Sequence, residues 1–161
     1  MDEHLRNRVF TFLNTLNPKV CAIATVSSPG MAHCAVMGYV VLPDFSLVLN
    51  THLHTRKWTN LSNNPKVALT FGWSLENAYL QYEGSAELIF SGEKHFRYEK
   101  LYFAEHTDAI KYKAQGETGT IRIKPLWFRF YDFTVDPTQV HEVSFDTGSP
   151  IALGSLRVYA N

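Results

Sequence analysis

The sequence predicts a mainly β protein, an antiparallel barrel that is closed or split, with flanking α-helices. Most apolar segments are short and are bounded by turn residues, which is typical of strands joined by hairpins. Helical spacing of apolar residues is found in only a few places. No repeat, linker or low-complexity tract divides the 161 residues, so we expect a single domain over 1–161.

The first element is expected to be a helix. Asp2 can cap it, and Asn17-Pro18 ends it. Its apolar positions fall on one helical stripe: Leu5, Val9, Phe12, Leu13 and Leu16. A second amphipathic helix is expected from a cap at Ser91 to about Ala104.

Strands are expected between and after these helices, joined in part by turns at Ser27 to Gly30 and at Pro43-Asp44. The expected strands are Val20 to Val26, Ala32 to Val41, Leu47 to Thr51, Lys66 to Trp73, Ala78 to Phe90, Ile121 to Lys124, Leu126 to Val135 and Val140 to Phe145. In the strand from Leu126, alternation places Trp127, Arg129 and Tyr131 on one face. Phe128 and Phe130 lie on the other, so we expect core on one side and a second subunit on the other.

Composition excludes several classes of function. The 15 basic and 15 acidic side chains give no net charge, and no basic run occurs, which argues against a nucleic-acid-binding barrel. No long apolar run or export signal is present, so we expect no membrane contact and a cytoplasmic location. Cys21 and Cys34 lie in apolar segments and are expected to be buried free thiols.

The segment from Asn50 to Phe71 carries the strongest functional signal. A strand runs into Thr55, Arg56 and Lys57, which begin a short helix. An isolated sequence of this kind is usually a capped helix with solvated cations. Here, however, cations stand at a helix N-terminus, where the dipole disfavours them by roughly 0.3 to 1 kcal/mol unless an anion is bound. The arrangement therefore predicts a site for a phosphorylated ligand, with a flavin nucleotide as the leading candidate.

These residues also carry a resemblance. Five motifs follow one another in order: Thr51, Thr55-Arg56-Lys57, Asn63-Asn64-Pro65, Val67 and Glu83-Gly84-Ser85-Ala86-Glu87. This stretch, roughly a quarter of the chain, resembles the flavin-binding core of the pyridoxamine 5′-phosphate oxidase-like split-barrel family.

The resemblance implies a homodimer with two FMN sites at the subunit interface. Thr55, Arg56 and Lys57 would hold the phosphate, while Asn50 and Thr51 would lie beside the ribityl chain or ring. The strand Ala35 to Val40, with Ala35, Val36 and Met37 as contacts, would lie along the flavin, and Gln81 or Tyr79 would reach the cofactor from a later strand. A deazaflavin or a haem is an alternative ligand, since similar barrels accommodate both.

The chain also departs from the vitamin B6 oxidases. It has Ala35 and Val40 where they carry cations, and it ends in SLRVYAN rather than in their basic segment. We therefore expect a flavoprotein whose substrate is not a vitamin B6 phosphate.

Two functions remain open: an FMN-dependent oxidoreductase acting on a small molecule, and a carrier or redox sensor without turnover. No catalytic acid or base is assigned. A metal site is not expected, since His52 and His54 lack a third ligand at suitable spacing. The role of residues 148–161 and the electron donor are not predicted.

Overall fold

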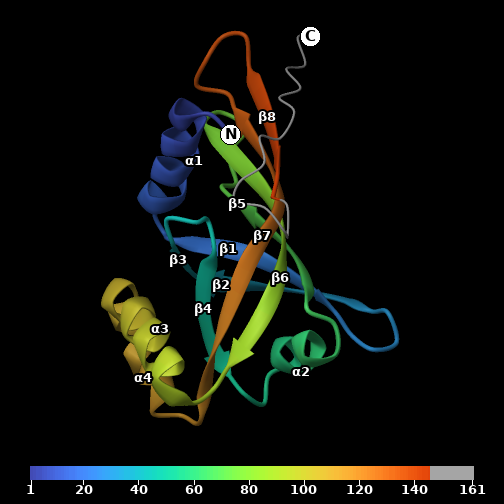
Figure 1. Cartoon of the computed structure of the whole chain (residues 1–161), viewed down its shortest axis with the longest axis vertical. Coiled ribbons are helices and arrows are strands. Elements are labelled where there is room, and N and C mark those ends of the chain that lie inside the picture. Colours follow the sequence, from blue (N-terminus) through green and yellow to red (C-terminus); the bar gives the residue numbers. More distant parts are fainter. Residues whose placement is uncertain (146–161) are drawn as a thin grey trace.

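The computed structural model describes residues 1–145, which form a strongly curled antiparallel sheet with helices packed on it (Figure 1). Seven of its strands follow the order β2-β1-β5-β6-β7-β4-β3, and β8 pairs with β7. The strands are β1 (Val20–Val26), β2 (Ala32–Gly38), β3 (Val40–Val41), β4 (Leu47–His52), β5 (Lys66–Phe71), β6 (Ala78–Ile89), β7 (Thr118–Asp132) and β8 (Gln139–Ser144). The sheet is a half-barrel, as the sequence predicted.

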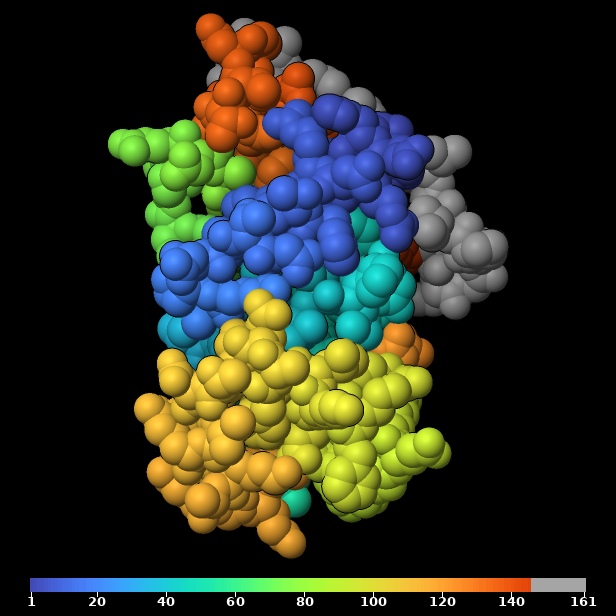
Figure 2. All heavy atoms as spheres, turned by 90° about the vertical axis from the view of Figure 1, so that its left-hand side faces the viewer, coloured from blue at the N-terminus to red at the C-terminus, as the bar shows by residue number. Residues whose placement is uncertain are grey.

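The helices cover two sides of this half-barrel. They are α1 (Glu3–Thr15), α2 (Arg56–Asn63), α3 (Gly92–Glu105), the 3₁₀ helix η1 (Thr107–Ala109) and α4 (Ile110–Lys113). Figure 2 shows one side, with α1 above and α3 and α4 below. Helix α2 lies on the opposite side in Figure 1, against β1 and β6. The sequence predicted α1, α2 and α3, whereas η1 and α4 were not predicted.

The expected strands Ile121 to Lys124 and Leu126 to Val135 are a single strand in the structure, which runs without interruption over residues 118–132 and includes Pro125. Trp127 pairs with Glu83 and Pro125 with Gly84, so Leu126 is an extra residue that bulges from the ladder. A bulge tolerates a residue without an N–H group, which explains the continuity.

The expected strand Ala32 to Val41 is interrupted at Tyr39, between β2 and β3. The Tyr39 side chain is fully buried and its ring packs edge-on against Phe71 at 4.8 Å. Its hydroxyl donates a hydrogen bond to the Leu13 carbonyl at 2.6 Å. That carbonyl lies in the last turn of α1, where helix carbonyls lack intrahelical partners. Tyr39 therefore links α1 to the sheet.

The main core fills the concave face of the sheet beneath α1. It includes Leu5, Val9 and Leu13 of α1 together with Leu49 and Ile121. A second, smaller cluster lies between α3 and the other face of β4, formed by Val48, Ile89, Tyr98 and Tyr102. Strand β4 is consequently buried on both faces, and it ends where α2 begins.

The face of β7 that carries Trp127, Arg129 and Tyr131 is only half-buried, whereas Phe128 and Phe130 are 1% and 2% exposed. This confirms the predicted alternation. Tyr131 stacks on Tyr79 at 4.3 Å. We expect a second subunit to cover this half-buried, aromatic outer face, which stays a prediction.

The two cysteines have different environments. Cys21 is buried, and burial raises its thiol pKa to about 12. Cys34, in contrast, is exposed, so the expectation of two buried thiols was wrong for this residue. The reason is that β2 is an edge strand and turns Cys34 to the outer face.

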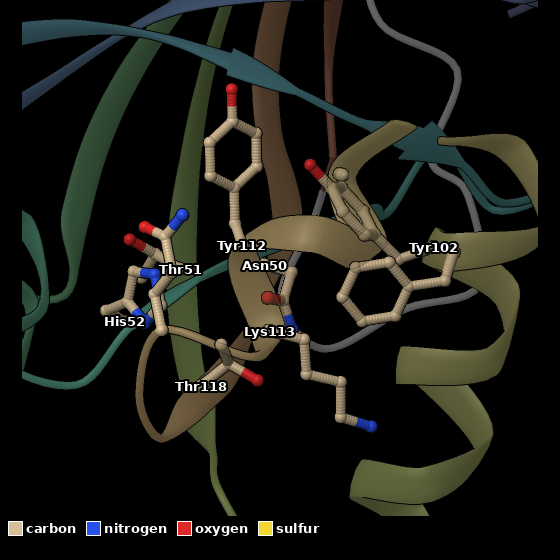
Figure 3. Close-up of a pocket in the computed structure, with 10 residues that line it drawn as sticks. Asn50, Thr51, His52, Tyr102, Tyr112, Lys113 and Thr118 are labelled. Atoms are coloured by element: carbon tan, nitrogen blue, oxygen red, sulfur yellow. The ribbon is translucent and has the colours of Figure 1, made fainter. Parts of the chain in front are cut away.

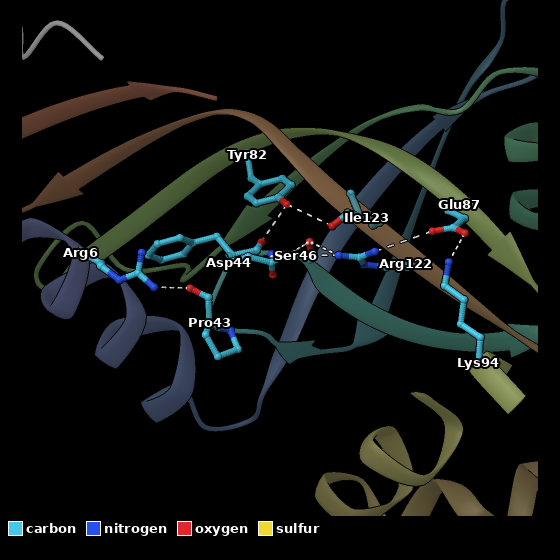
Figure 4. Close-up of polar contacts among 10 residues, drawn as sticks. Arg6, Pro43, Asp44, Ser46, Tyr82, Glu87, Lys94, Arg122 and Ile123 are labelled. Atoms are coloured by element: carbon cyan, nitrogen blue, oxygen red, sulfur yellow. Dashed lines mark hydrogen bonds and ion pairs between the residues drawn. The ribbon is translucent and has the colours of Figure 1, made fainter. Parts of the chain in front are cut away.

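Most charges near the β3–β4 turn are paired. Arg122 contacts Asp44, Ser46 and Glu87, and Lys94 forms an ion pair with Glu87 (Figure 4).

No helix in the described part of the chain is long and apolar enough to cross a membrane. Residues 148–161, whose role the sequence did not predict, lie outside the described residues.

We predict that Tyr39→Phe lowers the free energy of unfolding by about 1 to 2 kcal/mol, because the Leu13 carbonyl loses a buried donor. Urea denaturation followed by tryptophan fluorescence measures this. Tyr112→Phe is the matched control, since Tyr112 is 52% exposed. Equal stability of the two variants would contradict a link between α1 and the sheet through Tyr39.

Candidate functional site

The candidate site is built where β4 turns into α2. Thr55 is the N-cap residue of α2, but its side chain makes no cap hydrogen bond. The Thr55 hydroxyl instead donates to the His52 carbonyl at 2.9 Å. The amide of Thr59 makes the first helical bond, to the Thr55 carbonyl. The amides of residues 56–58 precede that bond and are available to an anion.

Two cations and two hydroxyls gather at this turn, which we call the Thr55–Lys57 turn (Thr55, Arg56 and Lys57). Lys57 Nζ lies 3.4 Å from the Thr51 hydroxyl, which in turn lies 3.3 Å from that of Thr55. Burial, and secondarily the charge of Arg56, lowers the pKa of Lys57. None of the ion pairs within residues 1–145 involves Arg56 or Lys57. The turn therefore holds positive charge without a carboxylate to offset it.

Helix α2 is fixed by contacts that the sequence did not reveal. Trp58 packs directly over Gly119 of β7, where an added Cβ would lie 2.3 Å from the Trp58 ring. Asn60 is 5% exposed, and its Nδ2 lies 2.9 Å from the Thr25 hydroxyl and 3.0 Å from His33 Nδ1. His33 of β2 is thus a half-buried polar partner of α2. No local pattern signals these contacts, because they join residues far apart in the chain.

Asn50, Thr51 and His52, at the end of β4, line a cavity of about 250 Å³ (Figure 3). We call this cavity, which lies between β4, α3 and α4, the β4 pocket. Other lining residues include Tyr102, Tyr112 and Lys113. Asn50 Nδ2 and His52 Nδ1 are both buried without a hydrogen-bond partner. Buried polar atoms without partners are uncommon in native proteins, and here they mark a place where a ligand would satisfy them.

The three residues of β2 that were expected beside the flavin lie on different faces of the strand. Ala35 and Met37 are half-buried and pack against the core, whereas Val36 is 69% exposed on the outer face. Strand β2 is at an edge of the sheet. Its backbone therefore presents N–H and C=O groups that a ligand or another chain can pair with.

Gln81 lies far from the Thr55–Lys57 turn within one chain. On β7, Gln81 pairs opposite Arg129, while Thr51 pairs opposite Gly119. Ten residues of strand separate these two positions, roughly 30 Å measured along β7. Within one chain, Gln81 is therefore remote from the turn. Tyr79, two residues earlier, lies farther still.

The structure gives no support for a metal site. Residues 1–145 contain no group of three or more histidine, cysteine or acidic side chains that could hold an ion. The rings of His52 and His54 stack on each other at 5.3 Å.

Comparison with known proteins agrees with this architecture. Residues 5–132 match the sequence model of the pyridoxamine 5′-phosphate oxidase family. A pyridoxine/pyridoxamine 5′-phosphate oxidase from Blochmanniella floridana is 30% identical over 73 residues, and one from Chromohalobacter salexigens is 33% identical over 73 residues. Each match covers 45% of this chain but only 34% of the relative, about a third of its length.

Solved structures resemble the whole fold. A pyridoxamine 5′-phosphate oxidase-related, FMN-binding protein from Nostoc punctiforme superposes with a TM-score of 0.74 at 11% identity, covering 94% of this chain and 95% of that one. A haem-binding protein from Mycobacterium smegmatis gives 0.69 at 16% identity, covering 87% and 58%. The family match spans most of the chain and the fold agrees with it, so this chain belongs to the pyridoxamine 5′-phosphate oxidase family and has its split-barrel fold.

Proposed function

We propose that this protein binds FMN through the Thr55–Lys57 turn and acts, as a homodimer, as an oxidoreductase on a small molecule. The observation that carries the proposal is the turn itself. Two cations that form no ion pair within residues 1–145, two hydroxyls and the first amides of α2 converge there. A phosphate dianion would offset the charge and accept hydrogen bonds from each kind of group.

The surrounding residues suit the rest of the cofactor. The unpaired Asn50 amide is a donor for a ribityl hydroxyl or a ring oxygen. The open edge of β2, from Ala35 to Met37, offers backbone groups to the polar rim of a flavin. Gln81 would reach the cofactor from the second subunit, whose contact with the half-buried outer face of β7 would complete the site.

When bound, FMN supplies hydride or electron transfer chemistry. The residues of this chain bind, orient and shield it. The β4 pocket next to the turn offers room for a substrate among Tyr102, Tyr112 and Lys113. Val40, where the vitamin B6 oxidases carry a cation, packs against the small apolar cluster instead. The substrate is therefore proposed to be a compound other than a vitamin B6 phosphate.

A carrier or sensor role is the second candidate, and haem the second ligand, because a haem-binding protein shares the fold. Reduction of the bound flavin by a nicotinamide, followed by rapid reoxidation with an acceptor, distinguishes an enzyme from a carrier. A haem absorbance band without flavin uptake would favour the haem alternative.

We predict that Arg56→Ala combined with Lys57→Ala weakens FMN binding by about 3 kcal/mol or more, because two charge-assisted contacts are lost. This corresponds to an increase in Kd of about 100-fold or more, measured by quenching of flavin fluorescence. Riboflavin, which lacks the phosphate, should bind both proteins equally. The matched control is Arg97→Ala with Lys100→Ala, which removes the same charge from exposed positions of α3. Unchanged FMN affinity in the first double variant would refute the proposal.

A second prediction concerns Gly119. In Gly119→Ala the new methyl group would overlap the Trp58 ring, so α2 and its cations must shift. FMN should bind about tenfold or more weakly, as expected for misplacement of a charge-assisted contact. Gly30→Ala is the control, because a Cβ at Gly30 meets nothing within 4 Å. Because Gly30 has a positive φ, Gly30→Ala should lower the stability of the protein somewhat, but it should leave the FMN affinity unchanged. An FMN affinity in Gly119→Ala equal to that of the unchanged protein would show that Trp58 packing does not position the turn.

A third prediction concerns pH. The pKa of Lys57 is lowered by burial, and a bound phosphate favours its charged form. FMN affinity should therefore fall as the pH rises through the pKa of Lys57 in the free protein, while riboflavin affinity lacks this component. The ratio of the two dissociation constants, measured between about pH 7 and about pH 10, tests this. Lys57→Arg should keep the ratio constant, and a constant ratio in the unchanged protein would exclude contact between Lys57 and the phosphate.

A further inference from the structure

A second cavity, of about 540 Å³, lies beside the β4 pocket at the outer side of α3. We call it the α3 cavity; its lining includes Leu53, Phe90, His95, Phe96, Glu99 and Lys113. Lys113 and Thr118 line both cavities and form the wall between them. The α3 cavity contains none of the residues assigned to the flavin.

In the α3 cavity, ionisable side chains are buried and aromatic side chains are exposed, which is the reverse of their usual distribution. Glu99 is 6% exposed and His95 is 8% exposed, although acidic side chains are rarely buried. Phe90 and Phe96, in contrast, are 63% and 69% exposed. A buried carboxylate with exposed aromatic rings beside it is the arrangement expected of a site that receives an apolar cation.

The charge on Glu99 is balanced by a half-exposed cation. Lys113 Nζ lies 2.8 Å from Glu99 Oε2, and the Thr118 hydroxyl donates to Oε1 at 3.3 Å. His95 Nε2 lies 3.7 Å from the same Oε1. The Lys113 side chain is 50% exposed, and it belongs to α4, whose residues are all exposed. An ion pair with a half-exposed lysine contributes little to stability, because water screens it.

We propose that the α3 cavity binds a small organic ammonium ion, an amine with an aromatic or aliphatic body. The ammonium group replaces that of Lys113 at the Glu99 carboxylate, while the body of the ligand covers Phe90 and Phe96. Lys113 leaves the rings of Phe90 and Phe96 exposed. The body of a bound ligand would bury apolar surface on both rings, and this burial favours the ligand over Lys113. Lys113 is thus an internal competitor for the site.

The test is isothermal titration of the full-length protein with 2-phenylethylammonium at neutral pH, without flavin. We expect saturable binding at one site per chain, and binding of neutral 2-phenylethanol that is at least about tenfold weaker. Glu99→Gln should weaken binding of the ammonium probe by about tenfold or more. Lys113→Gln should instead strengthen it several-fold, because the competitor is removed.

Two exposed positions keep the test independent of folding. Phe96→Ala should weaken binding about threefold or more through loss of ring contact, whereas Leu101→Ala, also exposed on α3, should leave it unchanged. The Arg56→Ala and Lys57→Ala double variant should bind the probe normally, which separates this site from the proposed flavin site. Equal binding of the amine and the alcohol, or Lys113→Gln and Phe96→Ala variants that bind like the unchanged protein, would overturn the proposal.

Discussion

The burial of strand β4 on both faces determines where the candidate site lies. Leu47, Val48 and Leu49 are all fully buried, between the main core on one side and α3 on the other. Pairing with β7 fixes the end of β4, so the turn that follows can begin α2 at only one place. There Trp58 packs over Gly119. The positions of Arg56 and Lys57 therefore depend on packing of the whole half-barrel.

This dependence explains how a cationic helix N-terminus is tolerated. The dipole of α2 disfavours Arg56 and Lys57, and within residues 1–145 no acidic side chain forms an ion pair with either. Packing of α2 holds them there nonetheless. The sheet also separates the proposed contacts in space. The cations follow the end of β4, the β4 pocket opens beside that end, and Gln81 lies roughly 30 Å away along β7. If Gln81 belongs to the proposed flavin site, a second chain would have to supply it.

Local patterns predicted much of this. Helical spacing found α1 and α3, alternation found both faces of β7, and the order of Thr55, Arg56 and Lys57 indicated the turn. What the sequence could not predict depends on contacts between distant residues. The anchoring of α2 by Asn60 and the interruption of the second expected strand at Tyr39 are of this kind. The sequence did not predict that β7 continues through the bulge at Leu126. It also did not predict that β2 is an edge strand, which leaves Cys34 exposed.

A phosphate site at the start of α2 is tested most directly by amide NMR of the labelled protein, titrated with FMN and, separately, with riboflavin. The difference between the two titrations reports the phosphate alone. We expect this difference to be concentrated at the amides of residues 55–58, at the start of α2. Differences confined to α1 or to the outer face of β7, with the α2 amides unmoved, would contradict it.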